Sequence, residues 1–210
     1  APLLVLPAAP KVNDVLAVDV YVDAGSDLPA GPKLHVERLA NVAPVSAEQA
    51  ISWNLVGPNL RGSGVRYDVR RDVPYSVYPE FEFDVPVGTG ERGMLGDCND
   101  RYMVRMREMR ESLSIIGQLI DNIPDGEFQA KTKAVLKLPK GEYYQRVETA
   151  RGELGVYMVS EGAMQPYRIK FRSPGFSNLS ALDHMARGAK IGDLVAIMGS
   201  LDLVIPDIDR

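Results

Sequence analysis

The chain has 210 residues, of which 45% are hydrophobic, and this is enough to bury a core in one compact unit with an appendage. Its 24 lysine and arginine residues against 28 aspartate and glutamate residues give a net charge of -4 and a pI near 5.3. No overall positive charge is therefore available to attract nucleic acid. We expect no nucleic-acid partner.

The small number of cysteine and histidine residues excludes further classes. With one cysteine, Cys98, and two histidines, His35 and His184, the chain can form neither a disulfide nor a metal site rich in these residues. We expect a reducing, cytoplasmic location. The opening APLLVLPAAP has no basic region, and no stretch approaches the roughly 18 apolar residues of a membrane span. Any membrane contact would be indirect.

The signals for local structure are weak over residues 1–42 and sharper afterwards. Residues 14–25 favour a strand, and residues 33–42 fit either a strand or a short helix. Ser46 and Gln49 predict a capping box at the start of a short helix over 46–54. The stretch FEFDVPV at 81–87 alternates in polarity as a half-buried strand does.

The clearest element is a long helix from about Asp97 to Ile123, capped by Asp97 or Asn99 and stopped by PDG at 124–126. Its apolar residues are spaced alternately 4 and 3 apart, which predicts a seam packed along its whole length against other helices. The seam comprises Tyr102, Met106, Met109, Leu113, Ile116, Ile120 and Ile123.

Three β-like runs follow, at 142–149, 153–160 and 167–173, and their short connections predict an antiparallel meander. Two helical stretches at 178–188 and 190–200 precede a C-terminal tail in which Pro206 is expected to block helix. The fold class is therefore α+β, a bundle of long helices with an antiparallel β meander.

Two motifs suggest phosphate binding. GTGERG at 88–93 matches the dinucleotide pattern G-x-G-x-x-G, but MLGD separates it from the following helix and Glu91 would place a negative charge beside the phosphates. A flexible loop is favoured. RGSGVRYDVRR at 61–71 could bind phosphate or nucleic acid, but the acidic total favours a solvated or subunit-facing loop.

No side chain stands out as catalytic. His184 would need partners from elsewhere in the fold to act as a general base, so a surface or interface position is favoured. Cys98 lies near a helix start, where a thiol can become reactive, but it has no second cysteine beside it. We assign neither residue a catalytic role.

Several blocks together resemble one family, and they occur in that family's order. The blocks are LRGSGVRYDVR at 60–70, EFDVPVG at 82–88, GDCNDRYMVRMREMRESLSII at 96–116, ETARGELGVYMVS at 148–160, PYRIKFRSPGFSNL at 166–179 and DLVAIMGSLDLVIPDIDR at 193–210. They are similar to the D subunit of bacterial NADH:quinone oxidoreductase, respiratory complex I. The resemblance covers residues 43–210, the C-terminal region of that protein, and leaves residues 1–42 unassigned and without a match.

The resemblance implies a fold like the large subunit of nickel-iron hydrogenase, incomplete in this chain. It implies a peripheral-arm subunit on the cytoplasmic face of the bacterial inner membrane. There it would dock on the small subunit that carries an iron-sulfur cluster, beside other peripheral-arm subunits and the membrane arm. One cysteine cannot supply the two Cys-x-x-Cys pairs of a working hydrogenase, so no metal or cofactor of its own is expected.

The resemblance also implies which residues meet the quinone. Asp202 and Val204 match the C-terminal segment that lines the quinone chamber, whereas His35 is not in the family's early histidine motif. This chain would form one wall of the site in an enzyme that couples electron transfer to proton translocation, and no activity is expected of the isolated chain. The alternatives are a structural or assembly module without a functional quinone site, and a nucleotide-binding enzyme that uses GTGERG.

Overall fold

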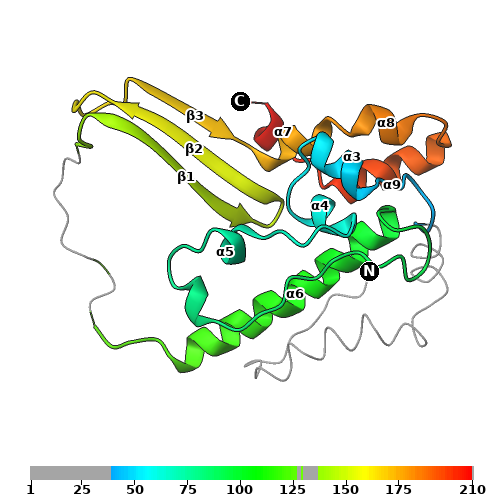
Figure 1. The fold of residues 1–210 in the computed structure, drawn as a ribbon, viewed down its shortest axis with the longest axis horizontal. Coiled ribbons are helices and arrows are strands. Elements are labelled where there is room, and N and C mark those ends of the chain that lie inside the picture. The colour runs from blue at the N-terminus through cyan, green and yellow to red at the C-terminus, as the bar shows by residue number, and fades with distance from the viewer. Residues whose placement is uncertain (1–38, 127–128, 130–136, 210) are drawn as a thin grey trace, which may run out of the picture.

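The structure of the protein, a computed structural model, describes residues 39–126, 129 and 137–209. A long helix runs along one side, a three-stranded sheet projects at one end, and short helices gather at the other end (Figure 1). This arrangement confirms the α+β class. The predictions for residues 14–25 and for most of 33–42, including His35, lie outside the described residues.

The first described elements are short helices: α3 (Ala47–Ser52), α4 (Pro58–Gly62) and α5 (Val69–Asp72), followed by a 3-10 helix at Tyr78–Glu80. The predicted capping box is confirmed. The Gln49 N–H donates to the Ser46 hydroxyl at 3.2 Å, and the Ser46 N–H donates to the Gln49 side chain at 3.1 Å. These two bonds satisfy N–H groups that the first turn of a helix leaves unpaired.

The long helix α6 spans Cys98–Asp121, and Asp97 caps it by accepting a hydrogen bond from the Asp100 N–H at 2.9 Å. The seam predicted on this helix does not pack along its whole length, and that prediction is wrong for the described structure. Met109 is 50% exposed, Ile116 48% and Ile120 57%. The reason is that α4 and α9 contact α6 near its N-terminal end. There Arg101 donates to Ser200 of α9, and Arg105 donates to Asn59 of α4.

Residues 81–87 are extended but form no strand, so this prediction is also wrong. The alternation does describe burial, because Phe83 and Val85 pack on Ile115 of α6. The backbone, however, pairs with side chains instead of a strand: the Glu82 N–H donates to Gln118 at 3.0 Å. Polarity alternation alone cannot distinguish these two partners of an extended segment.

The predicted meander is confirmed. Strands β1 (Gly141–Thr149), β2 (Gly152–Ser160) and β3 (Arg168–Arg172) form an antiparallel sheet in the order β1-β2-β3. β1 and β2 are paired from Gly141 opposite Ser160 to Thr149 opposite Gly152. The turn between them places Arg151 beside the C-terminal helices, which is where the candidate site lies.

The C-terminal part folds into α7 (Pro174–Leu179), α8 (Leu182–Ala186), α9 (Ile191–Leu201) and α10 (Ile205–Ile208). The two predicted helical stretches are present, the first of them divided between α7 and α8. Pro206 does not block helix as predicted, because it lies in the first turn of α10, where a missing N–H costs nothing.

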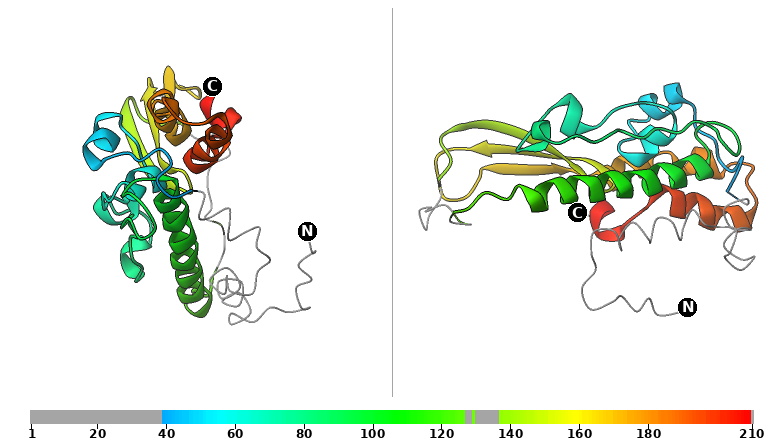
Figure 2. Two further views of the ribbon diagram at one scale, coloured as in Figure 1. Left: turned by 90° about the vertical axis from the view of Figure 1, so that its right-hand side faces the viewer. Right: turned by 90° about the horizontal axis from the view of Figure 1, so that it is seen from below.

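The main core lies where the short helices meet the start of α6. Two further views show α9 beside the N-terminal part of α6 (Figure 2). The buried residues of this cluster are Leu39, Val45, Ala50, Leu55, Leu60, Cys98, Ala181, Met185, Ile197 and Leu201.

Candidate functional site

Asp202 and Val204 lie in the link between α9 and α10. Asp202 ends α9 with left-handed backbone angles, φ 54 and ψ 53, and its N–H donates to the Gly199 carbonyl at 3.2 Å. Aspartate is one of the few residues that adopt this conformation readily. Its carboxylate lies 3.3 Å from the Arg151 Nε, and both side chains are 37% exposed. The turn and the ion pair together hold this carboxylate at the surface.

A second arginine approaches the same link from α6. The Arg105 Nη2 donates to the Asn59 side-chain oxygen at 3.1 Å, and the Asn59 amide donates to the Leu201 carbonyl at 3.1 Å. Burial lowers the pKa of Arg105 to about 10, although the charge of Asp202 opposes that change. Neither Arg105 nor Arg151 was found from the sequence, because nothing local connects either residue to position 202.

Cys98 is buried rather than poised for reaction. Its exposed fraction is 0%, and its Sγ lies 3.1 Å from Arg101 Nη2 and 3.4 Å from the Ser200 hydroxyl. Arg101 is itself 1% exposed, and burial lowers its pKa. These contacts join the start of α6 to α9, so Cys98 serves packing.

Arg61, from the arginine-rich segment, lies inside the protein. It is 1% exposed, and its guanidinium contacts the carboxylates of Glu148 at 2.9 Å, Glu108 at 2.5 Å and Asp68 at 3.8 Å. It also donates to the Tyr67 carbonyl at 2.9 Å. Elements α4, α5, α6 and β1 therefore meet at one buried cation, and neither a phosphate patch nor a solvated loop describes Arg61.

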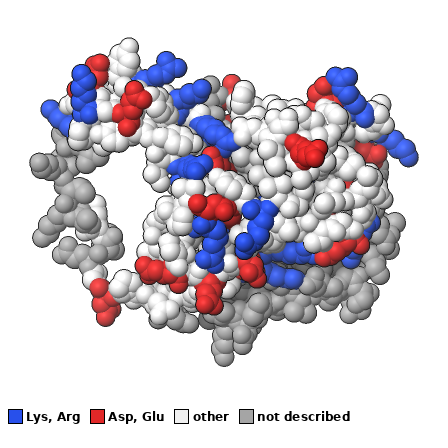
Figure 3. All heavy atoms as spheres, viewed as in Figure 1, with Lys and Arg blue, Asp and Glu red and all other residues white. Residues whose placement is uncertain are grey.

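Two neighbouring arginines also have partners. Arg70 forms an ion pair with Asp68 at 2.7 Å, and Arg71 donates to the Phe83 carbonyl at 2.6 Å with its guanidinium 3.9 Å from the Phe83 ring centroid. Arg66 is exposed. On the face seen in Figure 3, basic and acidic side chains are interspersed over the sheet and the short helices.

The buried cluster should make stability depend on acid. Burial alone would raise the pKa of Asp68, but the hydrogen bonds and charges of Arg70 and Arg61 outweigh burial and lower it below its ordinary value of 3.8. A lowered pKa stabilises the fold above the ordinary value, and this stabilisation is lost as the pH falls through the folded-state pKa. We expect Asp68→Asn to be less stable than the parent at pH 7 and to lose less stability on acidification. Urea unfolding at pH 7 and at a pH well below 3.8 measures both.

The pKa of Glu148 changes in the opposite direction. Burial raises it, although the charge of Arg61 opposes that change. The contribution of Glu148 to stability is present at low pH and declines as the pH rises through its folded-state pKa.

The prediction for Asp68 has a clear contrary outcome. If the Asp68→Asn protein lost as much stability on acidification as the parent, the acid dependence could not be assigned to Asp68.

The glycine-rich segment 88–93 is a loop, as the details of its sequence favoured. Its Gly90 N–H donates to the Asp100 carboxylate at 3.0 Å, and Glu91 forms an ion pair with Arg107. A Cβ added to Gly88 would lie 2.0 Å from the Gly62 carbonyl oxygen. The glycines therefore serve close packing, and the donor that a phosphate would need is already bound to a carboxylate.

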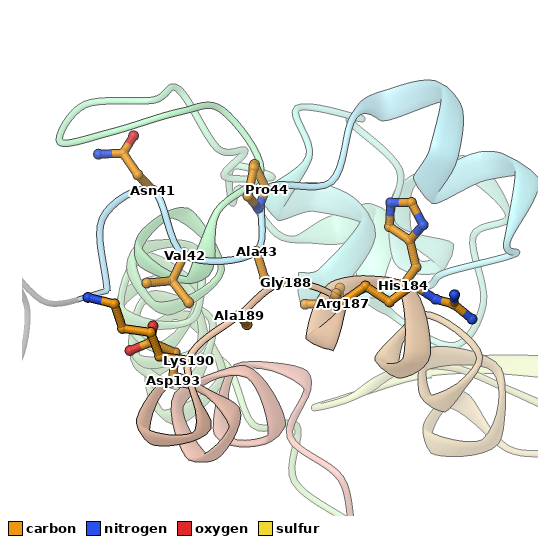
Figure 4. Close-up of a pocket in the computed structure, with 11 residues that line it drawn as sticks. Asn41, Val42, Ala43, Pro44, His184, Arg187, Gly188, Ala189, Lys190 and Asp193 are labelled. Atoms are coloured by element: carbon orange, nitrogen blue, oxygen red, sulfur yellow. The ribbon is translucent and has the colours of Figure 1, made fainter.

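His184 lines an open cavity of about 400 Å³ between the loop at Asn41 and the start of α9. Figure 4 shows its ring pointing toward α3, away from Lys190 and Asp193. The ring packs against Trp53 in a tilted arrangement, with centroids 4.6 Å apart. His184 is exposed, as its surface position expected from the sequence requires.

The described part of the chain offers no group of three or more His, Cys, Asp or Glu side chains that could hold a metal ion. Over the same ranges, each helix is too short or too polar to cross a membrane.

Comparison with known proteins identifies the family. A profile of the family described as respiratory-chain NADH dehydrogenase, 49 Kd subunit, matches residues 15–137 and 128–210. A D subunit of NADH-quinone oxidoreductase from Anaeromyxobacter dehalogenans, the one numbered 2, is 50% identical over 178 residues, which are 85% of this chain and 47% of that protein. The chain belongs to the 49 kDa subunit family. The resemblance to the D subunit of bacterial NADH-quinone oxidoreductase is thereby confirmed.

Other relatives of the 49 kDa subunit family agree. The D subunit of Bacillus cytotoxicus is 46% identical over 184 residues, 87% of this chain and 49% of that protein, and the D subunit of Desulforamulus reducens is 48% identical over 179 residues, 85% of this chain and 48% of that protein. The chain spans about half the length of the curated relatives it matches. The profile match begins at residue 15, and the division between residues 1–42 and 43–210 stays a prediction.

Proposed function

We propose that this chain forms part of the peripheral arm of NADH-quinone oxidoreductase, on the cytoplasmic face of the bacterial inner membrane. In this proposal it supplies one wall of the quinone-reduction site, against the small subunit that carries the iron-sulfur cluster and beside the membrane arm. The fold would be the C-terminal region of a hydrogenase large-subunit-like domain. A nickel-iron centre does not fit, because one cysteine cannot provide two pairs of thiolate ligands.

The observation that carries this proposal is the surroundings of Asp202. The carboxylate is partly exposed in a left-handed turn, bound to Arg151 and near the partly buried Arg105. Reduction of a quinone gathers negative charge on its oxygens before protons arrive, and fixed cations favour that charge. Val204, two residues further on, is the N-cap of α10 and is a partly buried apolar residue. The electrons would come from the partner's cluster, so the enzyme couples electron and proton movement only when assembled.

Substitution of the two predicted chamber residues tests the proposal. In the assembled enzyme we expect Asp202→Asn and Val204→Met each to lower quinone reduction or inhibitor affinity about tenfold, because one lost contact of about 1.4 kcal/mol has this effect. Ile51→Asn is the control, because the Ile51 side chain on α3 is 62% exposed. The measurements are the rate of quinone reduction by NADH and the concentration of a quinone-site inhibitor that halves it. Normal rates and normal inhibition in both variants, with normal assembly, would refute the proposal.

A structural or assembly module without a quinone site is the second candidate. The observation that favours it is that His35 does not lie in the family's early histidine motif. Co-expression with the iron-sulfur partner distinguishes the two functions. Binding of a labelled quinone-site inhibitor to the complex, abolished by Asp202→Asn, would support the chamber wall. Co-elution with the partner but without inhibitor binding would support the assembly module.

A further inference from the structure

The turn between β1 and β2, which carries Arg151, is attached to α7 by one buried side chain. The Asn178 amide donates to the Arg151 carbonyl at 3.4 Å, and its side-chain oxygen accepts a hydrogen bond from the Val56 N–H at 3.0 Å. Asn178 is 0% exposed, so water cannot replace either bond. Loss of this amide would leave a backbone donor and a backbone acceptor unpaired, and the turn would lose its link to α7.

Direct backbone contact also limits the position of the turn. A Cβ added to Gly57 would lie 2.4 Å from the Gly152 Cα, so the turn touches the residue that precedes α4. Within the turn, the Thr149 hydroxyl donates to the Gly152 carbonyl at 2.8 Å. The contact with Gly57 prevents the turn from moving toward α4, and the two bonds of Asn178 oppose movement away from it. The backbone of the turn is therefore fixed relative to α4.

The same helix also supports the segment that contains Asp202. Helix α7 packs on β2 and on α10 (Figure 1). The Gly175 N–H, in the first turn of α7, donates to the Asp207 carboxylate at 2.8 Å. Asp207 lies on α10, which directly follows the link that contains Asp202. Both members of the ion pair between Arg151 and Asp202 therefore depend on α7 for their position.

The ion pair at the candidate site depends on where the turn lies. The Arg151 Nε is 3.3 Å from the Asp202 carboxylate, but it is buried and makes no hydrogen bond within the described part of the chain. The attraction is therefore that of two charges, which weakens as their distance grows. Because the nearest atom is Nε and not the end of the side chain, the backbone of the turn largely sets this distance.

We propose that Asn178 is a positioning residue of the quinone-reduction site, which holds the β1–β2 turn so that Arg151 stays beside the Asp202 carboxylate. This inference rests on the proposed function. A turn freed from α7 lets Arg151 move away, and the negative charge of Asp202 is then less compensated. The carbonyl oxygens of a quinone carry partial negative charge, so a less compensated carboxylate weakens quinone binding.

The first test compares Asn178→Ala and Thr149→Val with the parent in the assembled enzyme. Each variant removes a hydrogen bond that orders the turn, and Thr149→Val does so with little change of shape and without altering α7. We expect each to raise the KM for quinone about fivefold, with kcat within about twofold of the parent. The concentration of a quinone-site inhibitor that halves the rate should rise by a similar factor. A purely structural role would instead lower the yield of assembled enzyme and leave the KM unchanged.

A double-mutant cycle tests whether Asn178 acts through Arg151. Arg151→Met should itself raise the KM, and adding Asn178→Ala should raise it no further, because the side chain that the turn positions is already absent. The matched control is Ser180→Ala. The Ser180 hydroxyl donates to the Trp53 carbonyl at 3.2 Å, so it joins the end of α7 to the end of α3 and not to the turn. The KM of this variant should equal that of the parent.

Asp202→Asn separates the failure of this inference from the failure of the proposed function. If Asp202→Asn raises the KM while Asn178→Ala and Thr149→Val leave it unchanged, Asn178 is not a positioning residue and the proposed function stands. An equal effect of Asn178→Ala with and without Arg151 would also overturn the inference. If Asp202→Asn leaves the KM unchanged, the proposed function is wrong and the inference falls with it.

Thr149→Val decides the matter alone if Asn178→Ala does not assemble. A normal KM in Thr149→Val would then overturn the inference. A raised KM that Thr149→Val does not raise further in the Arg151→Met background would support it.

Discussion

Replacing Arg61 with methionine should destabilise the chain by about 3–5 kcal/mol. The guanidinium is 1% exposed and lies between the carboxylates of Glu108 and Glu148, with Asp68 3.8 Å away. Without the guanidinium, these acids would remain close to one another inside the fold. Asp68 would still have its ion pair with Arg70, but Glu108 and Glu148 would lose the positive charge of Arg61. The large effect comes from the uncompensated carboxylates, more than from the lost contacts themselves.

Urea unfolding of the purified chain at pH 7 measures this loss. The matched control is Arg187→Met, because Arg187 pairs with Asp183 while their side chains are 74% and 78% exposed. Exposed pairs of this kind contribute little to stability, because water and salt screen them. Adding Glu148→Gln to Arg61→Met should recover part of the stability, since it removes one buried charge. If Arg61→Met were no more damaging than Arg187→Met, the account of a central buried cation would be wrong.

The elements that could be predicted depend on near neighbours in the sequence. The Ser46–Gln49 capping box and the Asp97 cap join residues three positions apart, and the β1–β2 hairpin joins two runs that are consecutive in the sequence. The Arg61 cluster could not be predicted, because Glu148 is 87 residues from Arg61 and no local pattern selects it. An arginine-rich segment with glycines ordinarily lies at the surface, and here a distant acid reversed that expectation.

Only part of the candidate site could be predicted from the sequence. The choice of Asp202 and Val204 came from the family resemblance, since no polarity pattern marks a left-handed aspartate at the end of a helix. Their neighbours Arg105 and Arg151 come from α6 and from the β1–β2 turn, and only the folded chain brings them together. The apolar stripe of α6 is visible in the sequence. Such a stripe predicts that one face of the helix packs against another element, but it does not indicate which element that is.

Gly96 is a position where one methyl group should be as damaging as the loss of a buried charge. A Cβ there would lie 2.0 Å from the Val45 carbonyl oxygen, and the backbone has φ +83, where side chains are strained. The Gly96 carbonyl also accepts hydrogen bonds from the Val45 N–H at 3.0 Å and from Arg101 at 2.6 Å. Relief of the clash would break contacts that join the start of α6 to the core, so Gly96→Ala should cost more than about 3 kcal/mol.

Gly162 separates the two causes of this loss. It has nearly the same φ, +84, but nothing lies within 4 Å of an added Cβ. Gly162→Ala should therefore cost only the strain of the left-handed backbone, about 1–2 kcal/mol. Urea unfolding of both variants measures the difference, which reports the steric contact with Val45 alone. Equal losses would mean that the loop before α6 moves away from Val45 freely, and that Arg101 does not depend on Gly96 for its buried position.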